Sequence, residues 1–210
     1  MNFSRKRTIL AVLFFFSFIF LTSVSSSSPY FEVDLQISTK IQSIHNFFFD
    51  LLMKFVSSVG NGRVMPVTAV ALTALLAYLQ MKIEAIYLIL SSMSAYLTGS
   101  LTKIIVNRPR PSSDLVAVYK NLSDNSFPSS HVLVFTVLFG FLLYVALKQS
   151  KDSRVKYLLA IFSVMILMNI GLSRIYLGAH WASDVLGGYL LGAMFLFLTI
   201  NIYSKNHGQR

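Results

Sequence analysis

Six apolar segments constrain this chain more than any other feature of its sequence. Each is close to the roughly 20 residues that a helix needs to cross a bilayer. The segments lie at residues 8–24, 64–81, 84–106, 129–147, 157–173 and 183–203. Only 12% of the 210 residues are charged, about half the share that a soluble domain carries. We therefore predict an all-α fold, a bundle of six transmembrane helices that forms a single domain over residues 1–210.

Composition excludes several classes of function. The chain has no cysteine, which rules out disulfides and thiolate metal sites. Its formal net charge is +10, but no basic segment is interleaved with aromatic residues in a polar setting, as nucleic-acid binding requires. In so apolar a chain, basic loops that orient the protein in a membrane explain the charge. We expect membrane lipids as its surroundings and no nucleic-acid partner.

The distribution of basic residues between loops predicts the orientation of the bundle. Six crossings leave both termini on one side, which carries ten basic residues: Arg5, Lys6, Arg7, Lys82, Lys148, Lys151, Arg154, Lys156, Lys205 and Arg210. The other side carries eight: Lys40, Lys54, Arg63, Lys103, Arg108, Arg110, Lys120 and Arg174. Four of these eight belong to the motifs described below, which leaves ten against four. The positive-inside rule then places both termini in the cytoplasm, and the motifs outside the plasma or inner membrane.

The first apolar segment has two interpretations. A charged leader over residues 1–7 precedes it, and four serines, 25–28, follow it. We predict a retained transmembrane helix; a cleaved signal peptide has the same layout. Either alternative leaves the motifs on the same side of the membrane.

The pattern changes between residues 31 and 59. Ile41, Ile44, Phe48, Leu51 and Phe55 recur at spacings of three and four residues, which predicts one amphipathic helix between the first two crossings. It either lies in the membrane interface or packs against the protein without lipid contact. A turn at residues 60–62, Gly-Asn-Gly, leads into the second crossing.

A basic cluster marks the end of the third crossing. Lys103, Arg108 and Arg110 lie where Pro109 and Pro111 prevent the helix from continuing. Such a cluster binds an anion, or it anchors the helix by letting long side chains reach the lipid headgroups.

A serine opens the fourth crossing. Ser129 follows Pro128 and is a natural N-cap for the apolar helix after it. The first backbone N–H groups of that helix, including those of Ser130 and His131, have no partner within the helix and form an anion site. The alternative is an ordinary capping serine beside a histidine.

The third motif contains a histidine and a carboxylate. His180 and Asp184 are four residues apart and would share one face of a helix. The carboxylate can then fix the tautomer of the ring and leave its other nitrogen as a nucleophile or base. Arg174 precedes them, across a connection that contains Gly178. Asp184 could instead merely cap the last crossing.

These three motifs resemble the signature of the type 2 phosphatidic acid phosphatase superfamily, which is K-x6-R-P, then P-S-G-H, then S-R-x5-H-x3-D. The matching residues are Lys103, Arg110 and Pro111, then Pro128, Ser129 and His131, then Ser173, Arg174, His180 and Asp184. The signature spans residues 103–184. One position departs from it, because Ser130 stands where the family has glycine; a serine keeps the backbone N–H and adds a hydroxyl.

The resemblance implies a role for each residue. His180 would be the nucleophile that forms a phosphohistidine, Asp184 would orient it, and His131 would protonate the leaving group and then activate water. Five residues would hold the phosphate oxygens: Lys103, Arg110, Ser129, Ser130 and Arg174. Arg108 has no family counterpart, and we expect it to contact a headgroup or the substrate.

The predicted function is therefore that of a membrane enzyme that hydrolyses a lipid phosphate or diphosphate without a metal or other cofactor. The basic side chains take the role that a metal ion has in other phosphatases. A soluble haloperoxidase of the same superfamily is excluded by the six crossings. The alternative is a non-catalytic protein that binds or moves lipids, although binding a headgroup requires neither His131 nor His180.

Overall fold

Eight α-helices and no strand make up the regular structure of the described residues. The chain is represented by a computed structural model that describes residues 3–59, 64–120, 122–149 and 153–207. The helices are α1 (Phe3–Ser25), α2 (Glu32–Gln42), α3 (Phe47–Val59), α4 (Val64–Tyr78), α5 (Lys82–Val106), α6 (Ser130–Gln149), α7 (Ser153–Tyr176) and α8 (Ala182–His207). The all-α prediction is confirmed. The turn predicted at residues 60–62 lies outside the described residues.

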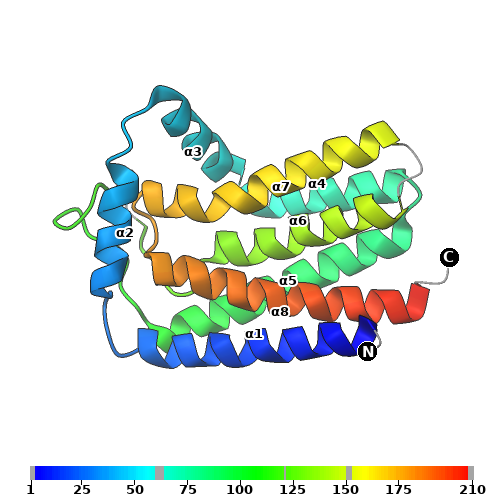
Figure 1. The fold of residues 1–210 in the computed structure, drawn as a ribbon, viewed down its shortest axis with the longest axis horizontal. Helices are drawn as coiled ribbons and strands as arrows, with labels where there is room; N and C mark the ends of the chain where they lie inside the picture. The colour runs from blue at the N-terminus through cyan, green and yellow to red at the C-terminus, as the bar shows by residue number, and fades with distance from the viewer. Residues whose placement is uncertain (1–2, 60–63, 121, 150–152, 208–210) are drawn as a thin grey trace.

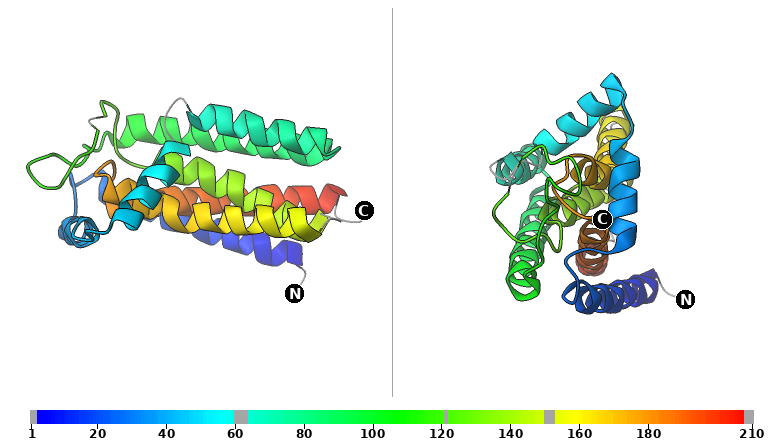
Figure 2. Two further views of the ribbon diagram at one scale, coloured as in Figure 1. Left: turned by 90° about the horizontal axis from the view of Figure 1, so that it is seen from above. Right: turned by 90° about the vertical axis from the view of Figure 1, so that its left-hand side faces the viewer.

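Helix α6 forms the centre of the bundle, and the other long helices lie around it (Figures 1 and 2). In its most apolar stretch, 72% of the residues are buried, against 17% for α1. Phe135, Leu138 and Phe139 of α6 are fully buried, because apolar residues occur all around this helix. An all-round apolar helix requires protein on every side.

Helix α1 lies on the outside, along α8 (Figure 1). The rings of Phe14 and Phe197 stack at 5.8 Å, and Asn201 Nδ2 of α8 donates to Thr8 Oγ1 at 3.1 Å. On the side away from α8, Phe16 and Phe20 are 64% and 72% exposed. An outer surface of large apolar side chains is what a helix presents to lipid.

Among the described residues, five helices are long and apolar enough to cross a membrane: α1, α5, α6, α7 and α8. Helix α4 has 15 residues and falls short of the roughly 20 that a crossing needs. The predicted crossing at 64–81 ends early because Gln80 adopts a left-handed φ of 63°, which terminates a helix. A sixth crossing exists only if α3 and α4, bent by 73°, together form one broken span.

The single amphipathic helix predicted within residues 31–59 is instead two helices, α2 and α3. Asn46 separates them, because its side-chain Oδ1 accepts from Phe49 N at 3.0 Å and so starts a new helix. The apolar stripe continues on α3, where Phe48 is 76% exposed. Helix α2 lies across one end of the bundle and buries polar residues, Asp34 and Ser38.

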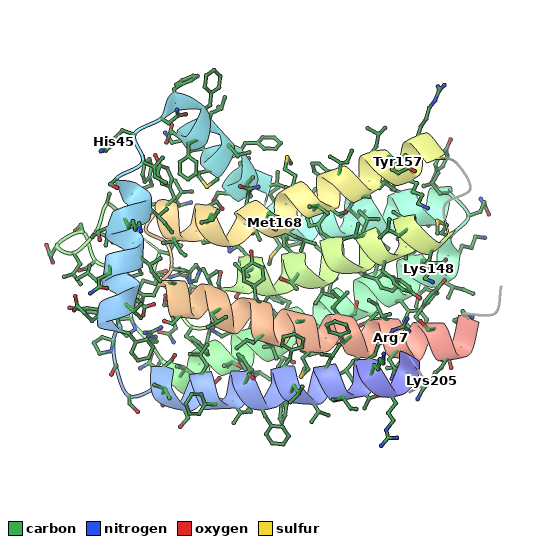
Figure 3. The ribbon with its side chains drawn as sticks, viewed as in Figure 1. Arg7, His45, Lys148, Tyr157, Met168 and Lys205 are labelled. Atoms are coloured by element: carbon green, nitrogen blue, oxygen red, sulfur yellow. The ribbon has the colours of Figure 1, made fainter. Side chains whose placement is uncertain are left out.

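The two ends of the bundle differ in what they carry. Helix α1 begins and α8 ends at the same end, where Figure 3 shows Arg7, Lys148 and Lys205. The connection between α2 and α3, with His45, lies at the opposite end. The loops that carry the three motifs lie at this second end, beside α2 (Figure 1).

Candidate active site

The three motifs meet at one cavity of about 990 Å³ at the α2 end of the bundle. Six of the eight predicted site residues line it: Lys103, Arg110, Ser130, His131, Arg174 and His180. Ser129 and Asp184 are both fully buried, and Asp184 lies behind His180. Residues of three separate motifs, 77 positions apart from Lys103 to His180, are thus brought to one place.

The last turn of α5 carries Lys103. The helix ends at Asn107, whose left-handed φ of 49° lets its backbone N donate to Lys103 O. Lys103 Nζ lies 3.1 Å from Asp124 Oδ2, and Arg110 Nη2 lies 2.8 Å from Asp124 Oδ1. The Asp124 carboxylate therefore bridges the two cations. Asp124 lies outside the three motifs, so the sequence did not predict this contact.

The start of α6 supplies the second motif. Helix α6 begins at Ser130, so Ser129 occupies the predicted N-cap position, and its backbone N donates to Asp184 O at 3.0 Å. Its Oγ and the Nε2 of His131 are buried and make no hydrogen bond with any described residue. Buried polar atoms are normally paired, so these two indicate a ligand site and not an ordinary cap.

The turn after α7 places the third motif. Ala179 N and His180 N both donate to Arg174 O, at 3.0 and 3.2 Å. Gly178 makes this possible with a φ of +65°, and a Cβ there would lie 2.1 Å from Ala117 O. Arg174 Nη1 donates to Ser57 Oγ of α3 at 2.7 Å, while its buried Nε has no partner among the described residues.

His180 and Asp184 are not on one helical face as predicted. His180 precedes α8, which begins at Ala182, and its Nδ1 lies 3.7 Å from Asp184 Oδ2, beyond hydrogen-bond distance. Ser126 lies between them: its Oγ donates to Asp184 Oδ2 and is 3.4 Å from His180 Nδ1. Sequence analysis missed Ser126, because a buried serine beside a motif carries no distinguishing pattern.

Burial and neighbouring cations set the charge of His180. Its burial, reinforced by Arg110 and Lys103, lowers the pKa of the imidazole well below its ordinary value. The ring is therefore neutral near pH 7 and carries a lone pair. Arg110 Nη1 lies 3.1 Å from His180 Nε2, so a phosphate on this nitrogen would lie beside a guanidinium.

Asp124 is ionised at the same pH. Partial burial alone would raise the pKa of its carboxyl, but Lys103 and Arg110 outweigh that effect and lower it. The carboxylate thus binds the two cations that a phosphate would bind, and it lines the same cavity.

Comparison with known proteins identifies this arrangement. Residues 84–207 match the model of the PAP2 superfamily, and this range contains all eight predicted site residues. The chain belongs to the PAP2 superfamily. It is a membrane phosphatase of this type.

Two relatives extend the PAP2 match beyond the motifs. An undecaprenyl-diphosphatase of Sulfolobus acidocaldarius is 31% identical over 157 residues, which cover 73% of this chain and 70% of the relative. Phosphatidylglycerophosphatase B of Bacillus subtilis is 25% identical over 191 residues, 89% of this chain and 91% of the relative. The crystal structure of a PAP2 phosphatidylglycerolphosphate phosphatase from Bacillus subtilis shares the fold, with a TM-score of 0.79 at 23% identity over 95% of this chain and 98% of that one.

One expectation about the PAP2 site is wrong. Arg108 does not reach a headgroup or the cavity, because its side chain is fully buried. It lies between two carboxylates, 2.7 Å from Asp184 Oδ1 and 3.1 Å from Asp34 Oδ2. Asp34 of α2 is a second residue that sequence analysis missed, since it precedes the signature by about 70 positions.

Proposed function

We propose that this PAP2 protein removes phosphate from a lipid phosphate or diphosphate through a phosphohistidine on His180. The observation that carries the proposal is a set of buried polar atoms of Ser129, His131 and Arg174 that have no partner among the described residues, around a neutral histidine. The three cations of the motifs, Lys103, Arg110 and Arg174, line the same cavity. Such a site holds and polarises a phosphoryl group.

The proposed reaction has two steps. His180 Nε2 attacks phosphorus, and the bond from phosphorus to the lipid oxygen breaks. His131 donates a proton to that oxygen, so the lipid leaves as a neutral alcohol or a lipid monophosphate. His131 then takes a proton from water, which attacks the phosphohistidine and releases inorganic phosphate. Lys103, Arg110 and Arg174 stabilise the charge on the phosphoryl oxygens throughout.

The residues that line the cavity and the names of the relatives support the proposed substrate class. Met65, Pro66 and Tyr96 line the cavity together with the cations, so an apolar tail and an anionic head can bind side by side. The names of the two relatives specify a lipid diphosphate and a lipid phosphomonoester. A protein that merely binds headgroups would not need a neutral histidine beside a carboxylate, which disfavours the non-catalytic alternative.

The membrane arrangement is part of the proposal. Helix α4 completes the six crossings as the membrane-spanning part of a broken span, while α3, bent by 73° from it, lies in the interface beside the cavity with its apolar face exposed. The basic side chains at the opposite end, among them Arg7, Lys148 and Lys205, support cytoplasmic termini and an active site outside the plasma or inner membrane.

Phosphate release by purified protein in detergent tests the activity. The panel contains an isoprenyl diphosphate, phosphatidic acid, phosphatidylglycerophosphate and a water-soluble sugar phosphate, each with and without EDTA. We expect release from at least one of the three lipids, little from the sugar phosphate, and no loss with EDTA. Binding of these lipids without release would support the non-catalytic alternative. Loss with EDTA that magnesium restores would overturn the metal-independent mechanism.

Cysteine labelling tests the sidedness, and the absence of native cysteine removes any background. Ser113→Cys, in the loop after α5, should react with an impermeant thiol reagent on intact cells. Lys205→Cys, near the end of α8, should react only after permeabilisation. The reverse pattern would place the active site in the cytoplasm.

A further inference from the structure

Helix α8 is capped by a residue of another helix. Ser183, in the first turn of α8, donates from its backbone N to Asp34 Oδ1 at 2.8 Å and from its Oγ to Asp34 Oδ2 at 2.7 Å. Asp34 lies 149 positions earlier, on α2. A carboxylate at a helix N-terminus satisfies N–H groups that the helix itself leaves free. Asp34 thereby attaches α2 to the helix that carries Asp184.

Arg108 connects this cap to the active site. Its Nη2 is 3.1 Å from Asp34 Oδ2, and its Nη1 is 2.7 Å from Asp184 Oδ1 and 2.7 Å from Ser183 Oγ. Its Nε donates to Ser28 O at 3.2 Å, and its guanidinium carbon lies 4.9 Å from the centre of the Phe31 ring. All three nitrogens of the guanidinium are paired, so none is left for a substrate.

Hydrogen bonds from three residues fix the orientation of the Asp184 carboxylate. Arg108 binds Oδ1, while Ser126 Oγ and Trp181 N donate to Oδ2, the latter at 2.8 Å. The carboxylate cannot rotate about its Cβ–Cγ bond without breaking a charge-assisted hydrogen bond. Oδ2 is the oxygen that faces His180 Nδ1. Arg108 therefore holds the oxygen pair in the orientation that supports the nucleophile.

A purely stabilising role would not explain this arrangement well. The side chains of Asp34, Arg108 and Asp184 are at most 1% exposed, and desolvating three charges largely cancels their attraction. Apolar residues at such positions often give equal or greater stability. What they cannot give is a carboxylate held in one orientation.

We infer that Arg108 is a positioning residue for the PAP2 reaction, which acts by orienting the Asp184 carboxylate toward His180. The inference rests on the proposed function of His180 as the nucleophile. It predicts that loss of the Arg108 contact slows attack on phosphorus and leaves phosphate binding intact, because Lys103, Arg110 and Arg174 are untouched.

The test compares variants with matched buried charge. Arg108→Gln alone would leave two buried carboxylates facing one another. The double variant Asp34→Asn/Arg108→Gln removes one charge of each sign and keeps the net charge of the wild type. Asp34→Asn alone, in which Arg108 still binds Asp184, is the control. Each is purified in detergent, and its melting temperature is measured together with kcat, the rate of phosphohistidine formation, and the Ki of inorganic phosphate.

We expect the double variant to lose about 10- to 100-fold in kcat and in phosphohistidine formation, the usual cost of a misplaced reacting group. Its Ki for inorganic phosphate should stay within about threefold of the wild type. Asp34→Asn should keep kcat within about threefold. A double variant with the kcat of Asp34→Asn would overturn the inference, as would a Ki that rises together with the loss of kcat.

Two further variants keep the inference open to refutation if the double variant is unstable. Arg108→Lys keeps the charge but loses the planar fork, and kcat should fall with Ki unchanged; a wild-type kcat would refute the role. In an Asp184→Asn background, the double change should cost little further kcat, because both act through the same carboxylate. Full additivity would contradict the inference. If the wild type itself releases no phosphate from any lipid, the proposed function fails instead.

Discussion

The two sides of His180 differ in how their polar groups are paired. On the cavity side, Ser129 Oγ, His131 Nε2 and Arg174 Nε are buried without a partner among the described residues. On the far side, Asp184 accepts from Arg108, Ser126 and Trp181. Unpaired buried groups are costly unless a ligand completes them, whereas fully paired ones fix geometry. We therefore propose that the cavity side binds phosphate and that the far side holds the nucleophile in position.

The same contrast appears in charge. The cavity side is lined by five cations, Lys54, Lys103, Arg110, Lys120 and Arg174, and by Asp124, which pairs with Lys103 and Arg110. The far side alternates Asp34, Arg108 and Asp184. An excess of positive charge attracts a phosphate, whereas a row of alternating negative and positive side chains produces little net electrostatic field. Substitutions on the two sides should therefore affect different steps.

The largest effect is expected at His180, where the two sides meet. His180→Ala removes the attacking nitrogen, so turnover should fall to background and no acid-labile phosphoenzyme should form. His45→Ala, an exposed histidine in the α2–α3 connection, is the control and should behave as the wild type. Phosphate trapping after acid quench measures both. A phosphoenzyme on the His180 variant would assign the nucleophile elsewhere.

His131 on the cavity side should show a smaller and substrate-dependent loss. His131→Ala withdraws the proton from the leaving oxygen, which is worth roughly 10²- to 10⁴-fold. With an activated substrate such as p-nitrophenyl phosphate, whose leaving group needs little protonation, His180 should still be labelled. Rates on the lipid and on the activated substrate are compared for the same preparation. If His131→Ala cannot be labelled while His180→Ala can, the two roles are reversed.

A substitution of Ser126 should affect only the far side of His180, where Asp184 lies. Ser126→Ala deletes the hydroxyl between His180 Nδ1 and Asp184 Oδ2, and we expect kcat to fall roughly 10-fold with the Ki of phosphate unchanged. Ser92→Ala, a buried serine of α5 whose Oγ has no partner among the described residues, is the matched control and should keep full activity. An effect of Ser126→Ala on Ki alone would move this residue to the binding side.

Asp124 should give the smallest effect, and one of opposite sign. Its carboxylate competes with phosphate for Lys103 and Arg110, so Asp124→Asn should lower the Ki of inorganic phosphate by about three- to fivefold, the scale of a partly exposed ion pair. The gain should diminish at high salt. Asp114→Asn, an exposed carboxylate on the same loop outside the cavity lining, should change nothing. A higher Ki for Asp124→Asn would mean that Asp124 holds the cations in place.

Local sequence determined most of the bundle and the binding side of the site. Apolar length predicted α1, α5, α6, α7 and α8, because a helix in a lipid bilayer must satisfy its backbone hydrogen bonds within its own segment. Pro109, Pro111 and Ser129 mark helix ends through their own backbone chemistry. The three motifs contain three of the five cations that line the cavity, Lys103, Arg110 and Arg174.

Tertiary structure decided the far side, because its partners are distant in sequence. Arg108 pairs with residues 74 and 76 positions away, and Asp34 caps α8 through Ser183, which lies 149 positions later. No local pattern distinguishes a buried arginine between carboxylates from one that faces lipid headgroups, and the expectation for Arg108 failed for that reason. The separation of His180 from Asp184 by Ser126 likewise depends on the turn at Gly178, which moves the histidine off α8. Periodicity describes residues within one helix, whereas this side of the site is made where three segments meet.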